Sequence, residues 1–142
     1  MQGALEMTRP GTEEALEDLL GFAEGALAEL GADSSATFAM RLAVEEAVTN
    51  VVTHGYAGRE PGPVTIRIAR EPNALLAEVE DQAPPFPPEA APEVDPSAPA
   101  DVRVPGGLGW YLLRQMVDGL SYETRPPGIN VLRLTKKLTE EV

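Results

Sequence analysis

The stretch AVEEAVTNVVTHG, Ala43 to Gly55, decides the fold prediction because it specifies two faces of a single helix. Its valines recur at i, i+4, i+7 and i+8, which is the spacing of an apolar face that packs on a sheet. A carboxylate, an amide and an imidazole recur every four residues on a different face, at Glu46, Asn50 and His54. This polar row is equally typical of a solvated helix surface, so a binding or catalytic interpretation needs residues from elsewhere in the chain.

The flanking sequence predicts the other elements. Thr12 and Gly31 have the chemistry of an N-cap and a C-cap, and the apolar residues between them recur at helical spacing. Asp33 or one of the two serines after it can cap the next helix. The expected order is a strand at 3–8, helices at 13–30 and 33–54, a hairpin at 64–69 and 74–81, a helix at 110–118, and strands at 120–125 and 130–138. This order predicts an α/β (α+β) two-layer sandwich with a mostly antiparallel, mixed sheet of about five strands and helices on one face.

Length and charge limit the classes of function. The 142 residues suit a single domain, 1–142, with a sizeable core. The formal charge of −12 disfavours direct binding to nucleic acid, and no apolar run reaches membrane-spanning length. No cysteine is present for a disulfide, a thiolate metal site or a nucleophile. We therefore expect a soluble cytoplasmic protein.

Residues 82–105 contain more than half of the chain's 14 prolines and show almost no periodicity. Proline is excluded from helix interiors and from central strands, so we expect a long loop. A loop of this length inside a compact domain is often functional, and its position before a glycine-rich turn suggests a lid over a ligand. A plain flexible surface loop explains the composition equally well.

Two further features could complete a site with the polar row. Asp81 ends a predicted strand, where a carboxylate can accept a hydrogen bond from an amine. The turn PGGLG then opens a helix, where small residues let backbone N–H groups approach a phosphate. Taken singly, a turn-forming aspartate and a glycine-rich turn are both common.

Together these motifs resemble a known family. The segments EEAVTNVVTHGY (45–56), EVEDQAPPF (78–86), GGLGWYLLRQMVD (106–118) and GINVLRLTKKL (128–138) are similar to those of bacterial anti-sigma-factor serine kinases. These kinases belong to the gyrase/chaperone/histidine-kinase ATPase superfamily, which has a Bergerat-type ATP-binding fold. The resemblance covers nearly the whole chain, and its first and third segments are the most specific.

The resemblance implies roles for single residues. Asn50 would be the protein's ligand to Mg²⁺, and Glu46 would be the general base that takes the proton of the attacking hydroxyl. Asp81 would bind the adenine amino group. His54 is expected to hydrogen-bond the loop after its helix.

The remaining site residues follow from the same resemblance. Gly107, Leu108 and Gly109 would present backbone amides to the phosphates of ATP, and Asn130 lies near a strand position that sends a polar side chain toward adenine. Ala83 stands where relatives usually have glycine, and its methyl group would either crowd the base or be tolerated. Arg103 is the one basic residue of the 82–105 segment.

The implied function is that of an ATP-dependent serine/threonine kinase. It would phosphorylate an anti-anti-sigma (antagonist) protein and sequester a sigma factor, with ATP and Mg²⁺ as cofactors and a homodimer as a possible assembly. The alternatives are a non-catalytic nucleotide-gated module that binds proteins, and an interaction domain with no ligand. A histidine kinase is disfavoured because the single histidine lies on the same helix as Asn50.

Overall fold

The computed structural model describes residues 3–86 and 113–138, which form one sheet covered by helices. The elements are β1 (Leu5–Pro10), α1 (Glu13–Leu30), α2 (Ser34–Asn50), η1 (Val51–Gly55), β2 (Pro63–Glu71), β3 (Ala74–Asp81), β4 (Gly119–Arg125) and β5 (Ile129–Lys137). Residues 113–116 form a further helical turn before β4. Among the described helices, none is long and apolar enough to cross a membrane.

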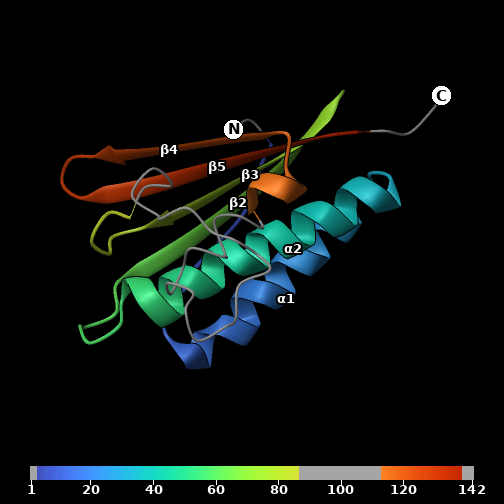
Figure 1. The fold of residues 1–142 in the computed structure, drawn as a ribbon. Helices are drawn as coiled ribbons and strands as arrows, with labels where there is room; N and C mark the ends of the chain where they lie inside the picture. Colours follow the sequence, from blue (N-terminus) through green and yellow to red (C-terminus); the bar gives the residue numbers. More distant parts are fainter. Residues whose placement is uncertain (1–2, 87–112, 139–142) are drawn as a thin grey trace, which may run out of the picture.

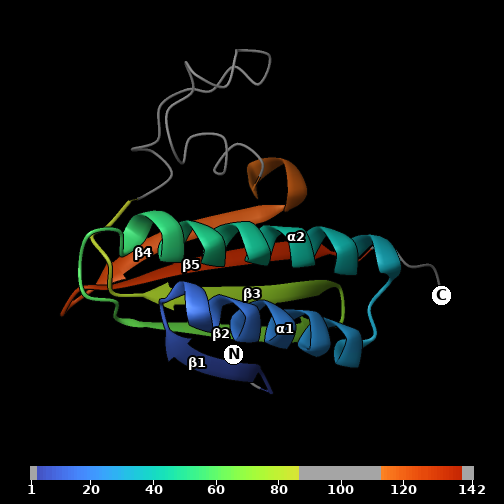
Figure 2. The same cartoon turned by 90° about the horizontal axis from the view of Figure 1, so that it is seen from below.

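The five strands form a single sheet in the order β1-β2-β3-β5-β4. Every pairing between described strands is antiparallel, so no parallel pair of the expected mixed sheet is present in this part of the chain. The expected two-layer sandwich is confirmed: α1 and α2 run side by side across one face of the sheet (Figures 1 and 2). β3 lies at the centre of the sheet, and its last residue, Asp81, is buried.

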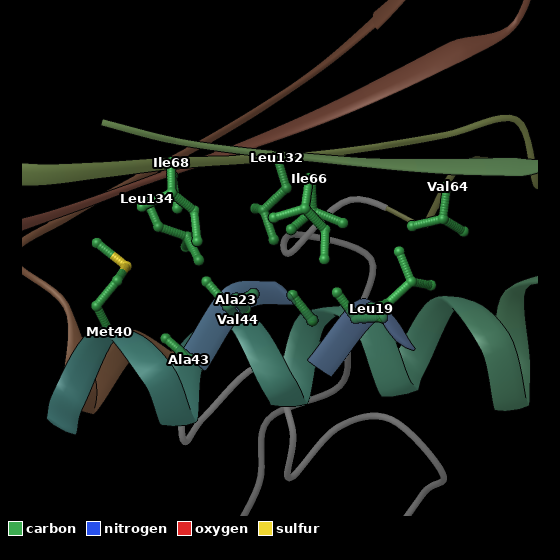
Figure 3. Close-up of a cluster of buried hydrophobic side chains, with 14 of the residues drawn as sticks. Leu19, Ala23, Met40, Ala43, Val44, Val64, Ile66, Ile68, Leu132 and Leu134 are labelled. Atoms are coloured by element: carbon green, nitrogen blue, oxygen red, sulfur yellow. The ribbon is translucent and has the colours of Figure 1, made fainter. Parts of the chain in front are cut away.

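The core lies between these two layers. Leu19 and Ala23 of α1 and Met40, Ala43 and Val44 of α2 point toward the sheet, and all five are fully buried (Figure 3). The opposing strand residues alternate as a half-buried sheet requires; they are Val64, Ile66, Ile68, Leu132 and Leu134. The predicted apolar face of the second helix is thus confirmed.

The outer face of the sheet carries ion pairs that cross the strands. Arg67 of β2 pairs with carboxylates of β1 and β3, and Arg133 of β5 pairs with carboxylates of β3 and β4. The acidic partners are Glu6, Glu78, Glu80 and Glu123. Cross-strand pairs of opposite charge stabilise adjacent strands, although each contributes little when it is exposed.

Most predicted helix boundaries are confirmed by their caps. The Thr12 side chain accepts a hydrogen bond from Ala15 N, and Gly31 ends α1 with a left-handed φ of 65°. The Asp33 side chain caps α2 by accepting from Ala36 N. The first strand was misplaced by two residues, since it spans Leu5–Pro10 and continues pairing to Pro63 of β2.

The second helix does not continue as a regular α-helix to His54. After Asn50 the backbone widens into a π-turn, η1, in which Tyr56 N donates to Val51 O at 3.0 Å, an i to i+5 bond. Such turns are rare and occur frequently at functional sites. Here the widened turn lies where α2 approaches the end of β3.

Candidate functional site

A pocket of about 360 Å³ lies between the end of α2, the turn η1 and the inner face of the sheet. Its polar lining comes from Asn50, His54, Arg59 and Asp81. Tyr122 and a set of apolar or small residues make up the rest of the described lining; that set is Ala47, Val51, Gly55, Ala57, Val79, Ala83, Pro84, Pro85, Phe86, Leu113 and Leu132. A mostly apolar cleft of this size with a few polar groups is typical of a small-molecule site.

Asp81 is the most constrained polar residue of the pocket. Strand alternation turns its side chain to the inner face of β3, and only 8% of the residue is exposed. Its Oδ1 atom accepts two hydrogen bonds, from Ala83 N at 2.9 Å and from Asn130 Nδ2 at 2.8 Å. Its Oδ2 atom has no hydrogen-bond partner among the described residues, so one acceptor remains available toward the pocket.

Burial raises the pKa of the Asp81 carboxyl above its ordinary value of 3.8, because the charged form loses hydration. The hydrogen bonds from Asn130 and Ala83 oppose this rise, and the nearby Glu80 charge adds to it. A buried carboxylate with a free oxygen therefore favours a ligand that brings its own N–H donor.

Asn130 lies directly behind Asp81 on β5, where the two residues are register partners. Its Nδ2 group donates to Asp81 Oδ1 and to Ala83 O, both at 2.8 Å, and its Oδ1 accepts from Thr124 Oγ1 at 3.0 Å. It is 1% exposed and is not among the residues that line the pocket. Asn130 therefore supports Asp81 from behind. The family resemblance implied a position from which its side chain would point toward the adenine.

Ala83 lines the pocket and contributes both of its backbone groups to the Asp81 environment. Its methyl group points toward the π-turn, because a Cβ built at Gly55 would lie 3.1 Å from Ala83 Cβ. The side chain that replaces the usual glycine thus fills the gap between η1 and the end of β3. Small residues at both positions let these two segments approach closely.

Tyr56 connects the same two segments. Its buried hydroxyl donates to Pro63 O at 3.0 Å and accepts from Gln82 N at 2.8 Å. Burial raises its pKa, so the hydroxyl keeps its proton at neutral pH. A Cβ at Gly11 would lie 2.5 Å from the Tyr56 ring, and a Cβ at Gly62 would lie 2.9 Å from the Tyr56 hydroxyl. Tyr56 therefore fixes the position of the chain that follows Asp81.

Three polar residues of the second helix and the following loop lie at the pocket without a described partner. The side chains of Asn50, His54 and Arg59 make no hydrogen bond to another described residue, although each lines the pocket. The expected side-chain bond from His54 to the following loop is therefore absent from this part of the structure. Its backbone carbonyl, instead, accepts from Ala57 N at 3.3 Å.

Glu46 lies one turn before Asn50 on α2 and is half-exposed. It is not among the described residues that line the pocket. Gly107, Leu108, Gly109 and Arg103 all lie outside the described residues, as does most of the 82–105 segment. The structure therefore brings together Asn50, Asp81, Ala83 and Asn130 of the predicted site.

Sequence reasoning missed several pocket residues. Tyr122 and Leu132 could have been found, because period-two alternation turns them to the same face as Leu134. Leu113 lies within the helix predicted at 110–118, and it is fully buried and lines the pocket. Arg59 carries no such signal, since its position depends on the path of the loop after η1.

Comparison with known proteins assigns a family to the part of the chain that forms the pocket. A family model described as a histidine kinase-like ATPase domain matches residues 10–136. The chain belongs to this family. The match runs from the end of β1 nearly to the end of β5, so it includes every element that forms the pocket.

The curated relatives of this family member include a serine-protein kinase and an anti-sigma F factor. The serine-protein kinase RsbW of Listeria monocytogenes is 30% identical over 108 residues, which are 72% of this chain and 66% of the relative. The anti-sigma F factor of Bacillus licheniformis is 27% identical over 103 residues, covering 71% and 69% of the two chains. The resemblance to anti-sigma-factor serine kinases is thus confirmed.

A solved structure agrees with the fold. The RsbU and RsbW domains of a Mycobacterium tuberculosis protein align with a TM-score of 0.67 and 22% identity. The alignment covers 99% of this chain and 34% of that one. This likeness confirms the two-layer fold of the ATPase domain.

Proposed function

We propose that this family member binds ATP and acts as a serine/threonine kinase on an anti-anti-sigma protein, while also sequestering a sigma factor in the cytoplasm. The observation that carries the nucleotide part is the Asp81 carboxylate, which lies in an apolar pocket with one oxygen free of described partners. The relatives named as serine-protein kinases and as an anti-sigma factor support the regulatory part.

The pocket suits a purine base with an exocyclic amine. Asp81 Oδ2 would accept the amine hydrogen, and the apolar side chains around it would contact the ring faces. Ala83 and Gly55 would let the base lie close to the backbone where η1 meets the end of β3. A charge-assisted hydrogen bond of this kind contributes about 1.5–3 kcal/mol.

Mg²⁺ would be held by Asn50 and by the phosphates of the nucleotide. Among the described residues, no cluster of three or more His, Asp or Glu side chains is placed to hold a metal. This fits Mg²⁺, which keeps several waters and takes few protein ligands beside substrate phosphates. The Asn50 amide lines the pocket and makes no hydrogen bond to a described residue, so its oxygen is free to coordinate. The bound ion would neutralise phosphate charge.

Glu46 would act on the protein substrate. A general base must reach the hydroxyl that attacks the γ-phosphorus, so it belongs on the side from which the substrate arrives. Glu46 lies one helical turn from Asn50 and outside the described lining of the pocket. The serine or threonine oxygen would form the new bond to phosphorus as its proton passes to Glu46, and ADP would leave with the bridging oxygen.

A second candidate is a non-catalytic module whose protein binding depends on the bound nucleotide. The observation that favours it is that Glu46 lies outside the described lining of the pocket. A carboxylate in that place can be an ordinary surface residue with no role in phosphoryl transfer. Both candidates use Asp81 and Asn50 to bind nucleotide. They differ in whether the phosphoryl group is transferred.

The deciding experiment is a phosphorylation assay with Mg-ATP and the cognate antagonist protein. The wild type is expected to phosphorylate the antagonist, and Glu46→Gln is expected to lower the rate by at least 100-fold. Glu45→Gln is the matched control, because Glu45 is the neighbouring carboxylate and its described ion pair is with Arg41 on the same helix. It should stay within threefold of the wild type.

The two candidates then give different results. Nucleotide binding by calorimetry without phosphotransfer in any variant would contradict the kinase and favour the module. Equal rates in Glu46→Gln and the wild type would contradict the role of Glu46. Absence of calorimetric binding to both ATP and ADP would contradict both candidates.

A further inference from the structure

The polar row of α2 continues toward the start of the helix with two apolar residues. Leu42 and Phe38 lie four and eight residues before Glu46, so all three lie on the same side of the helix. Ala43 and Val44, which follow Leu42, point the other way, into the core (Figure 3). The row therefore changes from polar to apolar as it leaves the pocket.

Phe38 and Leu42 form an apolar patch on the surface. Among the described residues, the exposed large apolar side chains are Phe38, at 55%, and Phe86, which lines the pocket. Leu42 is partly exposed and is not among the described side chains that form the core or pack against it. The Arg41 guanidinium lies over the Phe38 ring, 5.4 Å from its centroid, and pairs with Glu45 at 3.4 Å. Because these two charges offset each other, the patch offers apolar contact rather than charge.

The patch lies outside the pocket, beyond Glu46. The described lining of the pocket takes its first residue from α2 at Ala47. At a rise of about 1.5 Å per residue, Phe38 lies about 12 Å along the helix axis from Glu46 and farther still from Asn50. A nucleotide in the pocket is therefore not placed to cover Phe38. A protein interface is, since it buries about 800 Å² on each partner and extends well beyond 12 Å.

We propose that the patch of Phe38 and Leu42 docks the protein substrate, the antagonist whose hydroxyl reaches Glu46. The inference rests on the proposed function. The partner it fits is a folded protein with an apolar side chain about 12 Å from the phosphorylated serine or threonine. Aromatic and arginine side chains carry much of the binding energy of protein interfaces, and Phe38 and Arg41 supply one of each. Phe38 is a docking residue and takes no part in the chemistry.

The test is the steady-state phosphorylation of the antagonist by patch variants. Phe38→Ala should raise KM for the antagonist about tenfold, as for an aromatic residue central to an interface, and Leu42→Ala about threefold. The kcat should stay within twofold of the wild type, because a docking contact holds the substrate equally before and during transfer. Phe38→Tyr keeps the ring and should stay within threefold of the wild-type KM. Calorimetry should give all variants the same affinity for ADP.

Two controls separate docking from other causes. Ile68→Val removes a buried methylene from the core, so it should lower Tm without changing KM. Because the patch acts by apolar contact, the KM ratio of Phe38→Ala to the wild type should be the same in 0.05 M and 0.5 M NaCl. A ratio that vanishes at high salt would overturn apolar docking.

Calorimetric titration with the antagonist in the presence of ADP measures docking without phosphoryl transfer. Phe38→Ala should weaken this binding about tenfold. Unchanged affinity would overturn the docking role and leave the kinase standing. A variant that loses only the sigma factor, or that only changes the oligomeric state in sedimentation, would also overturn it. A wild type that binds the antagonist without phosphorylating it removes the kinase alone, whereas one that does not bind it removes both.

Discussion

At the scale of single residues, the central feature of the pocket is the Asp81 carboxylate, whose ionised form is destabilised by burial. Asp81 is nearly buried, and the loss of hydration raises its pKa in spite of two hydrogen bonds to Oδ1. No lysine or arginine among the described residues forms an ion pair with it. Such a residue costs stability unless a ligand completes its hydrogen bonding, which is common at binding sites.

Asp81→Asn is therefore expected to stabilise the unliganded protein at pH 7, because folding penalises only the ionised carboxylate. The pKa of Asp81 is raised on folding from about its ordinary value of 3.8. Folding then penalises the ionised form, so the wild type loses stability as the pH rises from 3.8 through the raised pKa. Asparagine keeps the Oδ1 acceptor and does not ionise.

Denaturant unfolding of the two proteins between pH 3 and pH 8 measures this. The free energies of unfolding should converge at the acid end and separate as the pH rises. A wild type that is the more stable protein at pH 7 would contradict the argument. It would mean that the hydrogen bonds outweigh the loss of hydration.

Residue roles were predicted unevenly. Asp81 and Asn50 were identified because a strand end and a helix row are visible as patterns, and the structure places both at one pocket. The orientation of Asn130 was not predictable. It depends on strand pairing, since Asn130 and Asp81 become neighbours only once β5 pairs with β3.

At the scale of elements, the site depends on how tightly the segments around Tyr56 pack. Gly11 follows β1 and Gly62 precedes β2, and the tyrosine ring lies against both. Gly11 N also donates to Gly62 O at 2.8 Å. Their lack of a side chain is what lets the ring reach the end of β3.

Gly11→Ala should destabilise the protein by about 2 kcal/mol, because its Cβ would lie 2.5 Å from Tyr56 Cδ2. Gly21→Ala is the matched control. Gly21 is exposed inside α1, and a Cβ there meets nothing within 4 Å. It should stabilise the protein by about 0.5–1 kcal/mol, since glycine lowers helix stability. Thermal unfolding of both variants checks the sign of each change, and a neutral Gly11→Ala would show that the ring can move away.

The helix ends that carry a side-chain or glycine cap were predictable from the sequence. The end of α2, which has no such cap, was not. Thr12, Gly31 and Asp33 act through local hydrogen bonds that depend on residues nearby in the sequence. The change to a π-turn after Asn50 has no such signal. It depends on contacts with the end of β3, which lies far along the chain.

At the scale of the whole molecule, the dominant feature is an excess of negative charge. The chain carries 23 acidic and 11 basic side chains, for a formal net charge of −12. Two of the basic residues, Arg67 and Arg133, are used in the pairs that cross the outer face of the sheet. The remaining acidic residues repel one another, which opposes the compact state.

Raising NaCl from 0.05 M to 0.5 M should therefore increase stability by about 1 kcal/mol, or about 3 °C in Tm. Screening weakens both the repulsion and the ion pairs, but partly exposed pairs contribute little. Thermal unfolding at several salt concentrations measures the balance. A Tm that falls with salt would show that the cross-strand pairs outweigh the excess charge.

The order and type of the elements were predictable because apolar periodicity, caps and turns all agree. The hairpin at 63–81 and the two helices needed no long-range information. The strand order β1-β2-β3-β5-β4 did, because β1 pairs with β2 only after both helices have intervened. Local sequence patterns therefore predict the individual helices and strands. The pocket depends on the pairing of strands that are far apart in the sequence.

The π-turn has a consequence for which length changes this helix can tolerate during evolution. Its bond from Tyr56 N to Val51 O encloses one residue more than an α-helical bond would. A chain with one residue deleted there would close the same turn with an i to i+4 bond, so it would form a regular helix and the chain after it would keep its direction. The tyrosine would then stay within reach of Gln82. Homologous chains with this pocket should therefore tolerate the loss of one residue between Asn50 and Tyr56, with a regular α-helical turn in place of the π-turn.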